Sequence, residues 1–312
     1  MINIASAAIP SEYNWIQIGC DLEARDGSRK SFPGHMCIFL DDGSLITASA
    51  EAIRKITKGQ EIQWSFPGNF HHQMNISPDG KRILSLTHEV GGMDQLKLRQ
   101  DGLVILDLNG KLIAKTTADD LLKLSGIEPM KTGNETSHFN SIYEIPENRL
   151  KNKVSWLKPG NIIVNSLHLG IFVLSPDLKT LHQHVRFHEG PRGHSIHDVQ
   201  VTPEGNLLFF NNHVDDGSKK LFSAIQEMNP LTKKVSSLFT ARPKEMFYTE
   251  GGGGVQRIGD NIFFSHTLTG GYLYSTETKD IVKLFPQNRE VQSRWIQEIK
   301  MIDASGFLKN SN

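Results

Sequence analysis

Short apolar stretches alternate with polar turns along most of the chain. The turns carry Asp-Gly, Pro-Asp-Gly or Pro-Glu-Gly sequences, whereas long stretches with the 3.6-residue spacing of amphipathic helices are nearly absent. This pattern predicts an all-β protein of short strands joined by hairpin turns. Residues 117–137 and 147–158 break the pattern and are predicted to be insertions, with one helical turn at 119–124.

The strand pattern repeats. Three segments open with a histidine and place a hairpin glycine eight positions later, and weaker copies begin near His138, Gly254 and Glu298. Six units of about four strands predict a six-bladed β-propeller in one domain, residues 1–312. The last unit has only two strands, so we expect the N-terminal strands at residues 15–22 to complete it and close the ring. A large β-sandwich is the alternative fold, but it does not explain the repeated spacing. The three histidine–glycine pairs are His35 and Gly43, His72 and Gly80, and His197 and Gly205.

Charge and composition narrow the function. The 34 basic and 34 acidic residues balance, which argues against a partner such as nucleic acid or an anionic membrane surface. No apolar run approaches the ~20 residues of a membrane span. Residues 1–15 lack the features of a secretory signal, which predicts a cytoplasmic location, or a periplasmic or secreted one if a leader has been trimmed. Two cysteines, Cys20 and Cys37, cannot form a cysteine-based zinc site, and the sequence leaves their pairing open.

The chain contains 13 histidines. In a propeller whose blades begin with the innermost strand, the first residues of these strands meet at one end of the axis. His35, His72, His138 and His197 are therefore predicted to converge, and His266, which ends a second strand, reaches the same region. Histidines that only bond water and backbone at a polar rim are the alternative interpretation.

At these histidines the sequence resembles a known family. Residues 71–285 resemble the bacterial arylsulfotransferases that do not use a nucleotide sulfate donor. The resemblance implies a six-bladed propeller, no cofactor, and a ping-pong reaction in which a histidine takes the sulfuryl group from an aryl sulfate and passes it to a phenol. The matching pieces are the pair His71 and His72, HFNSI from His138, GNIIVNS from Gly160, HDVQVTPEGNLLFFNN from His197, and GGVQ from Gly253.

The resemblance also implies roles for single residues. His197 matches the nucleophile, which would carry the group as N-sulfohistidine. His138 and Asn140 match a His-x-Asn pair that contacts the sulfate oxygens, and residues two apart on a strand share a face. His71 or His72 matches a further histidine of the site, and a protonated His72 or His138 could serve as general acid.

One position departs from the family. The family has an arginine shortly after a pair of small polar residues, but here Leu167 occupies that place and His168 follows. Arg192 is the cation that could compensate from a nearby loop. The substrate-binding residues predicted beside the catalytic set are His71, His168, Arg192, Gln256 and His266.

Two other functions remain open. The same imidazoles, His72, His138, His197 and His266, could bind a divalent metal for a lyase or oxygenase reaction. A non-catalytic, ligand-binding propeller is the third interpretation, since fold alone does not fix function. In the enzymatic interpretations the ligand is a small anionic or aromatic molecule, and the sequence does not indicate an oligomeric state.

Two neighbours of the candidate nucleophile receive structural roles. Asp198 follows His197 on a strand and should point to the opposite face, so we interpret it as a structural hydrogen-bond acceptor. The four glycines at 251–254 are interpreted as a turn that needs positive φ, in preference to an anion-binding nest.

Overall fold

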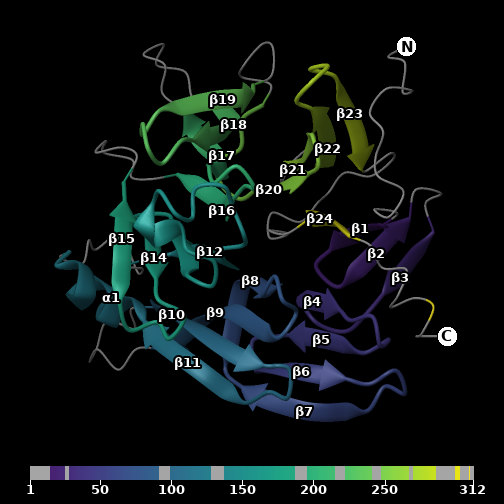
Figure 1. Cartoon of the computed structure of the whole chain (residues 1–312). Coiled ribbons are helices and arrows are strands. Elements are labelled where there is room, and N and C mark those ends of the chain that lie inside the picture. The colour runs from purple at the N-terminus through teal and green to yellow at the C-terminus, as the bar shows by residue number, and fades with distance from the viewer. Residues whose placement is uncertain are drawn as a thin grey trace.

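The computed structural model describes residues 15–24, 28–90, 99–127, 137–186, 195–214, 222–240, 247–266, 270–285, 299–302 and 309. Within these residues, six four-stranded antiparallel sheets form a ring (Figure 1). The predicted six-bladed β-propeller is therefore confirmed. No helix among the described residues has both the length and the apolar character needed to cross a bilayer.

Five blades consist of consecutive strands, with the innermost strand first. Blade 1 contains β4 (Met36–Phe39), β5 (Leu45–Ala48), β6 (Ala52–Ile56) and β7 (Ile62–Pro67). Blade 2 contains β8 (Asn69–Ile76), β9 (Arg82–Val90), β10 (Arg99–Asp107) and β11 (Leu112–Thr117). Blade 3 contains β12 (Phe139–Glu144), β13 (Ile162–Ser166), β14 (Gly170–Leu174) and β15 (Leu181–Val185). Blade 4 contains β16 (Ile196–Val201), β17 (Leu207–Val214), β18 (Phe222–Met228) and β19 (Val235–Phe239). Blade 5 contains β20 (Gly254–Ile258), β21 (Asn261–His266), β22 (Gly270–Ser275) and β23 (Ile281–Phe285).

Blade 6 combines the two ends of the described chain. Its innermost strand, β24 (Ile299–Ile302), pairs antiparallel with β1 (Trp15–Ile18), so that Lys300 lies opposite Gln17. The remaining strands are β2 (Asp21–Ala24) and β3 (Arg29–Ser31). Closure of the ring by N-terminal strands is confirmed, but the division of the sheet differs from the prediction. The C-terminal segment supplies one of its four strands instead of two, because β1 pairs directly with β24, and the N-terminal segment supplies the other three.

A disulfide strengthens this closure. Cys20, in the turn between β1 and β2, is bonded to Cys37 of β4. The bond joins blade 6 to blade 1, which are the two blades where the chain closes on itself. At the same junction the amide of Gln17 donates to the carbonyl oxygen of Cys37 at 2.7 Å. The structure thus answers the question of cysteine pairing that the sequence left open.

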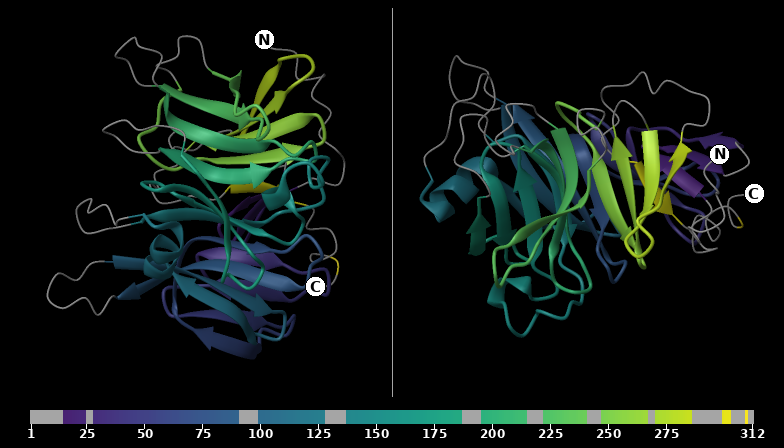
Figure 2. Two further views of the ribbon diagram at one scale, coloured as in Figure 1. Left: turned by 60° about the vertical axis from the view of Figure 1, so that its left-hand side comes forward. Right: turned by 90° about the horizontal axis from the view of Figure 1, so that it is seen from above.

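The hydrophobic core lies between neighbouring blades, which pack face against face (Figure 2). Between blades 2 and 3 this core also receives the insertion helix α1 (Ala118–Ser125), through Leu121 and Leu122. Thr117 caps its first turn and Gly126, with φ of 62°, ends it. The helix is longer than the single turn predicted, because its buried leucines add tertiary packing to its weak local preference. The second insertion contains the short 3₁₀ helix η1 (Ser155–Leu157), which buries Leu157 between blades 3 and 4.

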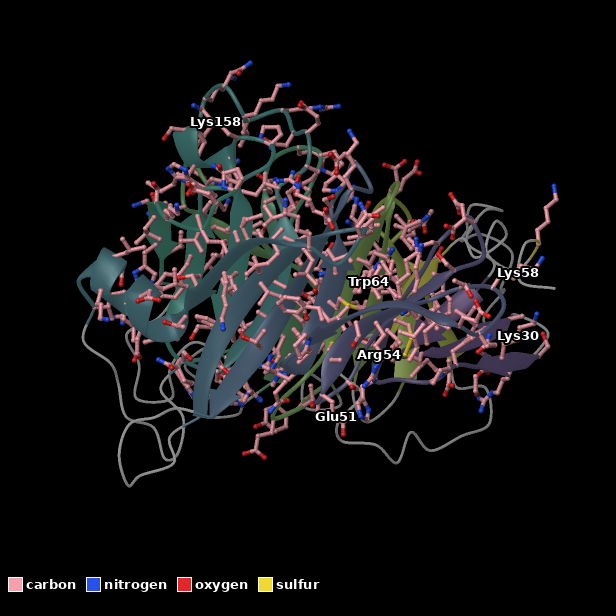
Figure 3. All side chains as sticks on the ribbon, turned by 90° about the horizontal axis from the view of Figure 1, so that it is seen from below. Lys30, Glu51, Arg54, Lys58, Trp64 and Lys158 are labelled. Atoms are coloured by element: carbon pink, nitrogen blue, oxygen red, sulfur yellow. A yellow bond between two sulfur atoms is a disulfide. The ribbon has the colours of Figure 1, made fainter. Side chains whose placement is uncertain are left out.

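Contacts at the outer strands also join blades. Trp64 of β7 (Figure 3) donates through its indole N–H to the carbonyl oxygen of Leu108 in blade 2, at 2.9 Å. Gly110, with φ of 77°, lies under the same indole, and a Cβ there would come within 2.6 Å of the ring. This turn therefore requires glycine both for its backbone conformation and for the close approach of Trp64.

The innermost strands are tied together by a buried polar network around Asp198 of β16. One carboxylate oxygen accepts hydrogen bonds from the Tyr143 hydroxyl of β12 and from the Gln73 amide of β8. The other oxygen accepts from the backbone N–H of Val255 in β20, at 2.6 Å. Asp198 therefore connects blades 2, 3, 4 and 5, and its predicted role as a structural acceptor is confirmed.

Blade 6 joins the inner strands through Lys300. Its ammonium group donates to the side-chain oxygen of Asn75 in β8 and lies 5.7 Å from the centre of the Tyr143 ring. The amide of Asn75 in turn donates to the carbonyl oxygen of Ile142 in blade 3, at 2.7 Å. The strand that closes the ring is thereby linked to the same central group of side chains.

The disulfide should contribute measurably to stability. Its two cysteines are 17 residues apart in sequence, and a loop of this length predicts a loss of about 3 kcal/mol in the free energy of unfolding when the bond is removed. Urea unfolding of the wild type with and without reductant measures the loss. The Cys20→Ser/Cys37→Ser double variant should have the unfolding free energy of the reduced wild type, and reductant should not change it. A wild type whose unfolding midpoint does not change on reduction would contradict this role.

Candidate active site

The innermost strands of blades 2, 3 and 4 are irregular at the same end of the propeller, which we call the mouth. Each shows a shift of register against its neighbour. At or beside these shifts His72, His138 and Asp198 adopt φ angles of 59°, 48° and 53°. The other non-glycine residues with positive φ in the described part of the chain lie in hairpin turns. Left-handed backbone away from turns often marks a functional site, and here it occurs where the sequence predicted the histidines to meet.

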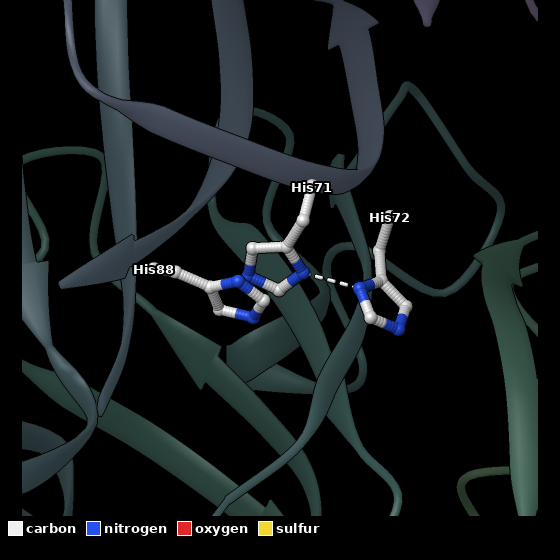
Figure 4. A group of neighbouring side chains, drawn as sticks. All are labelled: His71, His72 and His88. Carbon is white, nitrogen blue, oxygen red and sulfur yellow. Dashed lines mark hydrogen bonds between the residues drawn. The ribbon is translucent and has the colours of Figure 1, made fainter. Parts of the chain in front are cut away.

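Three histidines of blade 2 form one cluster at the mouth (Figure 4). His71 and His72 follow each other on β8, and His88 lies on the neighbouring strand β9. Nδ1 of His71 contacts Nδ1 of His72. The rings of His71 and His88 are stacked, with 3.3 Å between their centres and 16° between their planes.

The cluster rests on a buried carboxylate. Asp101 of β10 is only 1% exposed, and one of its oxygens lies 3.4 Å from Nε2 of His71 and 3.2 Å from Nε2 of His88. Its other oxygen accepts from the Ser137 hydroxyl at 2.7 Å and from the Phe139 N–H at 2.9 Å. Asp101 therefore lies against the two rings of blade 2 and, through its hydrogen bonds, holds the start of the innermost strand of blade 3.

A row of imidazoles continues from blade 2 into blade 3. Nε2 of His72 lies 3.3 Å from Nε2 of His138, and the centre of the His138 ring lies 5.8 Å from that of His168. The Leu167 N–H donates to the carbonyl oxygen of His138 at 2.9 Å. The segment in which the family places its arginine thus lies directly against His138.

His197 is held in one tautomer by its neighbours. The amide nitrogen of Asn212 donates to the carbonyl oxygens of Thr249 and Gly252, at 3.1 and 2.7 Å, so the Asn212 side-chain oxygen must act as an acceptor. This oxygen lies 2.6 Å from Nδ1 of His197, which therefore carries the proton. Nε2 of His197 accepts from the N–H of Gly252 at 3.3 Å. Its lone pair is therefore on Nε2.

Burial keeps His197 neutral. The residue is 6% exposed, and loss of solvation lowers its pKa to about 4, although the hydrogen bond with Asn212 acts in the opposite direction. Positive charge on His138 or His213 lowers the pKa further. At neutral pH His197 is thus a neutral base in a largely dry position, and it is close enough to His138 to sense its charge.

The glycine-rich segment 251–254 forms the predicted turn. Gly252 and Gly253 have φ of 72° and 113°, and a Cβ on Gly253 would come within 2.9 Å of the Phe210 ring. The turn also has a role that the sequence did not reveal, because its Gly252 N–H donates to His197.

Asn140 contacts different neighbours from His138. Its amide nitrogen donates to the carbonyl oxygen of Ile196 at 2.8 Å, and its oxygen accepts from the Asn165 amide at 2.8 Å. Asn140 is buried and supports the backbone immediately before His197. The left-handed conformation of His138 and the register shift after Phe139 interrupt the strand alternation on which the sequence-based expectation relied.

The structure brings together most of the residues that the sequence singled out. His72 and His138 are in contact, and His71, His168 and His197 lie around them. Gln256 is on β20, the innermost strand of blade 5. His35 precedes β4 and is exposed. Arg192 and the side chain of His266 lie outside the described residues.

Three residues of the candidate site were not predicted from the sequence: His88, Asp101 and Asn212. His88 and Asn212 lie on second strands near the mouth. From the sequence, this position was predicted for His266 alone. Both could have been predicted if the polar residues at the ends of all second strands had been considered together. Asp101 follows from no local pattern, because its partners His71 and Phe139 lie on other strands.

The comparisons with known proteins support the fold. Neither a protein-family model nor a curated protein sequence matches the chain. A Bacteroides caccae protein of unknown function is similar in structure, with a TM-score of 0.56 and 12% identity over 91% of this chain and 97% of its own. An oligogalacturonate lyase from Vibrio parahaemolyticus has a TM-score of 0.53 and 10% identity over 89% of this chain and 74% of its own. At such low identity these likenesses concern the fold alone, and neither protein is described as an arylsulfotransferase.

The lowered pKa of His197 predicts a pH-dependent stability. Between its ordinary pKa of 6.5 and about 4, the unfolded chain binds a proton that folded His197 does not, so this residue's contribution is lost as pH falls. From about pH 7 to about pH 5 the wild type should lose about 2 kcal/mol more unfolding free energy than His197→Gln. Urea unfolding at the two pH values measures the difference. Equal losses in both proteins would show that His197 is not a buried neutral imidazole.

Proposed function

We propose that the chain is an enzyme that transfers a sulfuryl group from an aryl sulfate to a phenolic acceptor through His197. The observation that carries the proposal is the state of His197: a neutral, buried imidazole whose Nδ1 proton is held by Asn212 and whose Nε2 bears the lone pair. A nucleophile oriented by a second group is the arrangement that covalent catalysis requires. The resemblance of residues 71–285 to the arylsulfotransferases supports the choice of sulfur as the reacting atom.

The first half-reaction forms a bond between Nε2 of His197 and the sulfur. The bond between sulfur and the aryl oxygen breaks, and its electron pair leaves with the phenolate, which takes a proton from the medium or from an imidazolium. In the second half-reaction a phenol oxygen attacks the same sulfur, the nitrogen–sulfur bond breaks, and the phenol proton is released. The electron pair of the broken nitrogen–sulfur bond returns to Nε2, so His197 is regenerated in its neutral form.

Donors around His197 fit an anionic group. The N–H of Gly252 donates to Nε2 at 3.3 Å, so Nε2 must leave this contact to attack, and the same N–H is then close to an oxygen of the group that Nε2 carries. The imidazoles of His138 and His72 offer further N–H donors at the mouth. Fixed donors of this kind stabilise the charge of the transferring group. Asn140 acts in this proposal as a positioning residue, through the carbonyl oxygen of Ile196.

The disulfide bears on where this chemistry takes place. Disulfides persist in oxidising compartments, whereas cytosolic thiols are kept reduced. The Cys20–Cys37 bond supports a periplasmic or secreted location over the cytoplasmic one expected from residues 1–15.

Rapid quench with 4-nitrophenyl sulfate tests the proposal. Mass spectrometry of the wild type should show a single added sulfuryl group on a peptide that contains His197. His197→Gln should lose this adduct and about a thousand-fold or more in kcat/KM, whereas His182→Gln, at an exposed position of β15, should retain both. A wild type that releases nitrophenolate catalytically without an adduct on His197 would overturn the mechanism.

A further inference from the structure

We propose that His71, His72 and His88 bind one divalent transition-metal ion, Zn²⁺ in the first place, and that Asp101 orients two of these ligands. In the described part of the chain this is the one group of three such side chains whose ligand atoms all lie within 4.8 Å of one another. It shares only His72 with the metal set suggested by the sequence. Three imidazoles with an open position form a common catalytic Zn²⁺ site.

The backbone supports convergence on a common ligand. Consecutive residues of a regular strand point to opposite faces of the sheet, yet His71 and His72 direct their Nδ1 atoms toward each other (Figure 4). The left-handed φ of 59° at His72 and the register shift after His71 make this possible. Such a conformation is strained, and a metal bound by both rings would offset the strain.

The position of Asp101 fits that of a carboxylate behind metal-bound histidines. Its oxygen lies 3.4 Å from Nε2 of His71 and 3.2 Å from Nε2 of His88, and a proton on each of these Nε2 atoms would leave the lone pair of each ring on Nδ1. The Nδ1 of His71 is the atom that faces His72. The carboxylate is itself fixed by the Ser137 hydroxyl and the Phe139 N–H. This pairing of a buried carboxylate with metal-bound imidazoles also compensates the charge of Asp101.

The site lies next to the proposed active site. If His72 binds the metal through Nδ1, its Nε2 carries a proton and donates to Nε2 of His138, 3.3 Å away. His138 then bears its own proton on Nδ1. If the proposed function holds, the ion supplies near His138 the permanent positive charge for an anionic substrate that Leu167 cannot supply.

Zn²⁺ titration of untagged, chelator-treated protein tests the site without reference to activity. Calorimetry should show one ion per wild-type chain, and Co²⁺ should give the visible absorption of a nitrogen-coordinated ion. His88→Ala should weaken Zn²⁺ binding more than about 100-fold, and Asp101→Asn about 10- to 100-fold. His182→Ala, at an exposed histidine outside the cluster, should bind like the wild type.

Binding and catalysis separate the two proposals. A folded wild type that binds no Zn²⁺, or a folded His88→Ala protein that binds it unchanged, overturns the metal site whatever the sulfuryl assay shows. If His88→Ala does not fold, the wild-type titration and Asp101→Asn decide the question. A metal-binding wild type without a His197 adduct retains the metal site and rejects the proposed function.

Discussion

The carboxylate of Asp198 is the interaction on which the arrangement at the centre of the propeller depends. It accepts hydrogen bonds from blades 2, 3 and 5 while belonging to blade 4. A buried carboxylate is stable only when such donors are supplied, and each donor is equally dependent on it. Because Asp198 directly follows His197, the same bonds that join the blades also set the position of the candidate nucleophile. Its left-handed backbone turns the carboxylate toward the axis while the preceding ring meets Asn212.

The mouth combines imidazoles in different environments. His197 is buried, neutral and held in one tautomer, whereas His72 and His138 are only half-buried and touch each other across a blade junction. Behind them the stacked pair His71 and His88 faces the carboxylate of Asp101. From blade 4 to blade 2 the mouth thus contains, in spatial order, the Nε2 lone pair of His197, the N–H donors of His138 and His72, and the negative charge of Asp101.

Much of this could be predicted from the sequence, for a physical reason. Hairpin turns are specified locally by glycine and its neighbours, so the histidine-to-glycine spacing revealed the number of blades, and ring closure then placed His72, His138 and His197 at one end. The contacts of Asn140 could not be predicted, because strand alternation assumes regular backbone and the register shifts after Phe139. Asp101 could not be predicted for another reason. Its contacts are with residues on other strands, and the spacing of residues within β10 gives no information about them.

The coupling between Tyr143 and Asp198 tests the central claim most directly. A double-mutant cycle with Tyr143→Phe and Asp198→Asn compares the unfolding free energies of four proteins, and asparagine tolerates the left-handed backbone at position 198. If the carboxylate of Asp198 is shared by the inner strands, the coupling free energy should be at least about 1 kcal/mol. Both single variants should also form less of the sulfuryl adduct on His197. If the two substitutions change the unfolding free energy additively, and Asp198→Asn forms the His197 adduct like the wild type, the view that this carboxylate holds the inner strands and the histidines in place is contradicted.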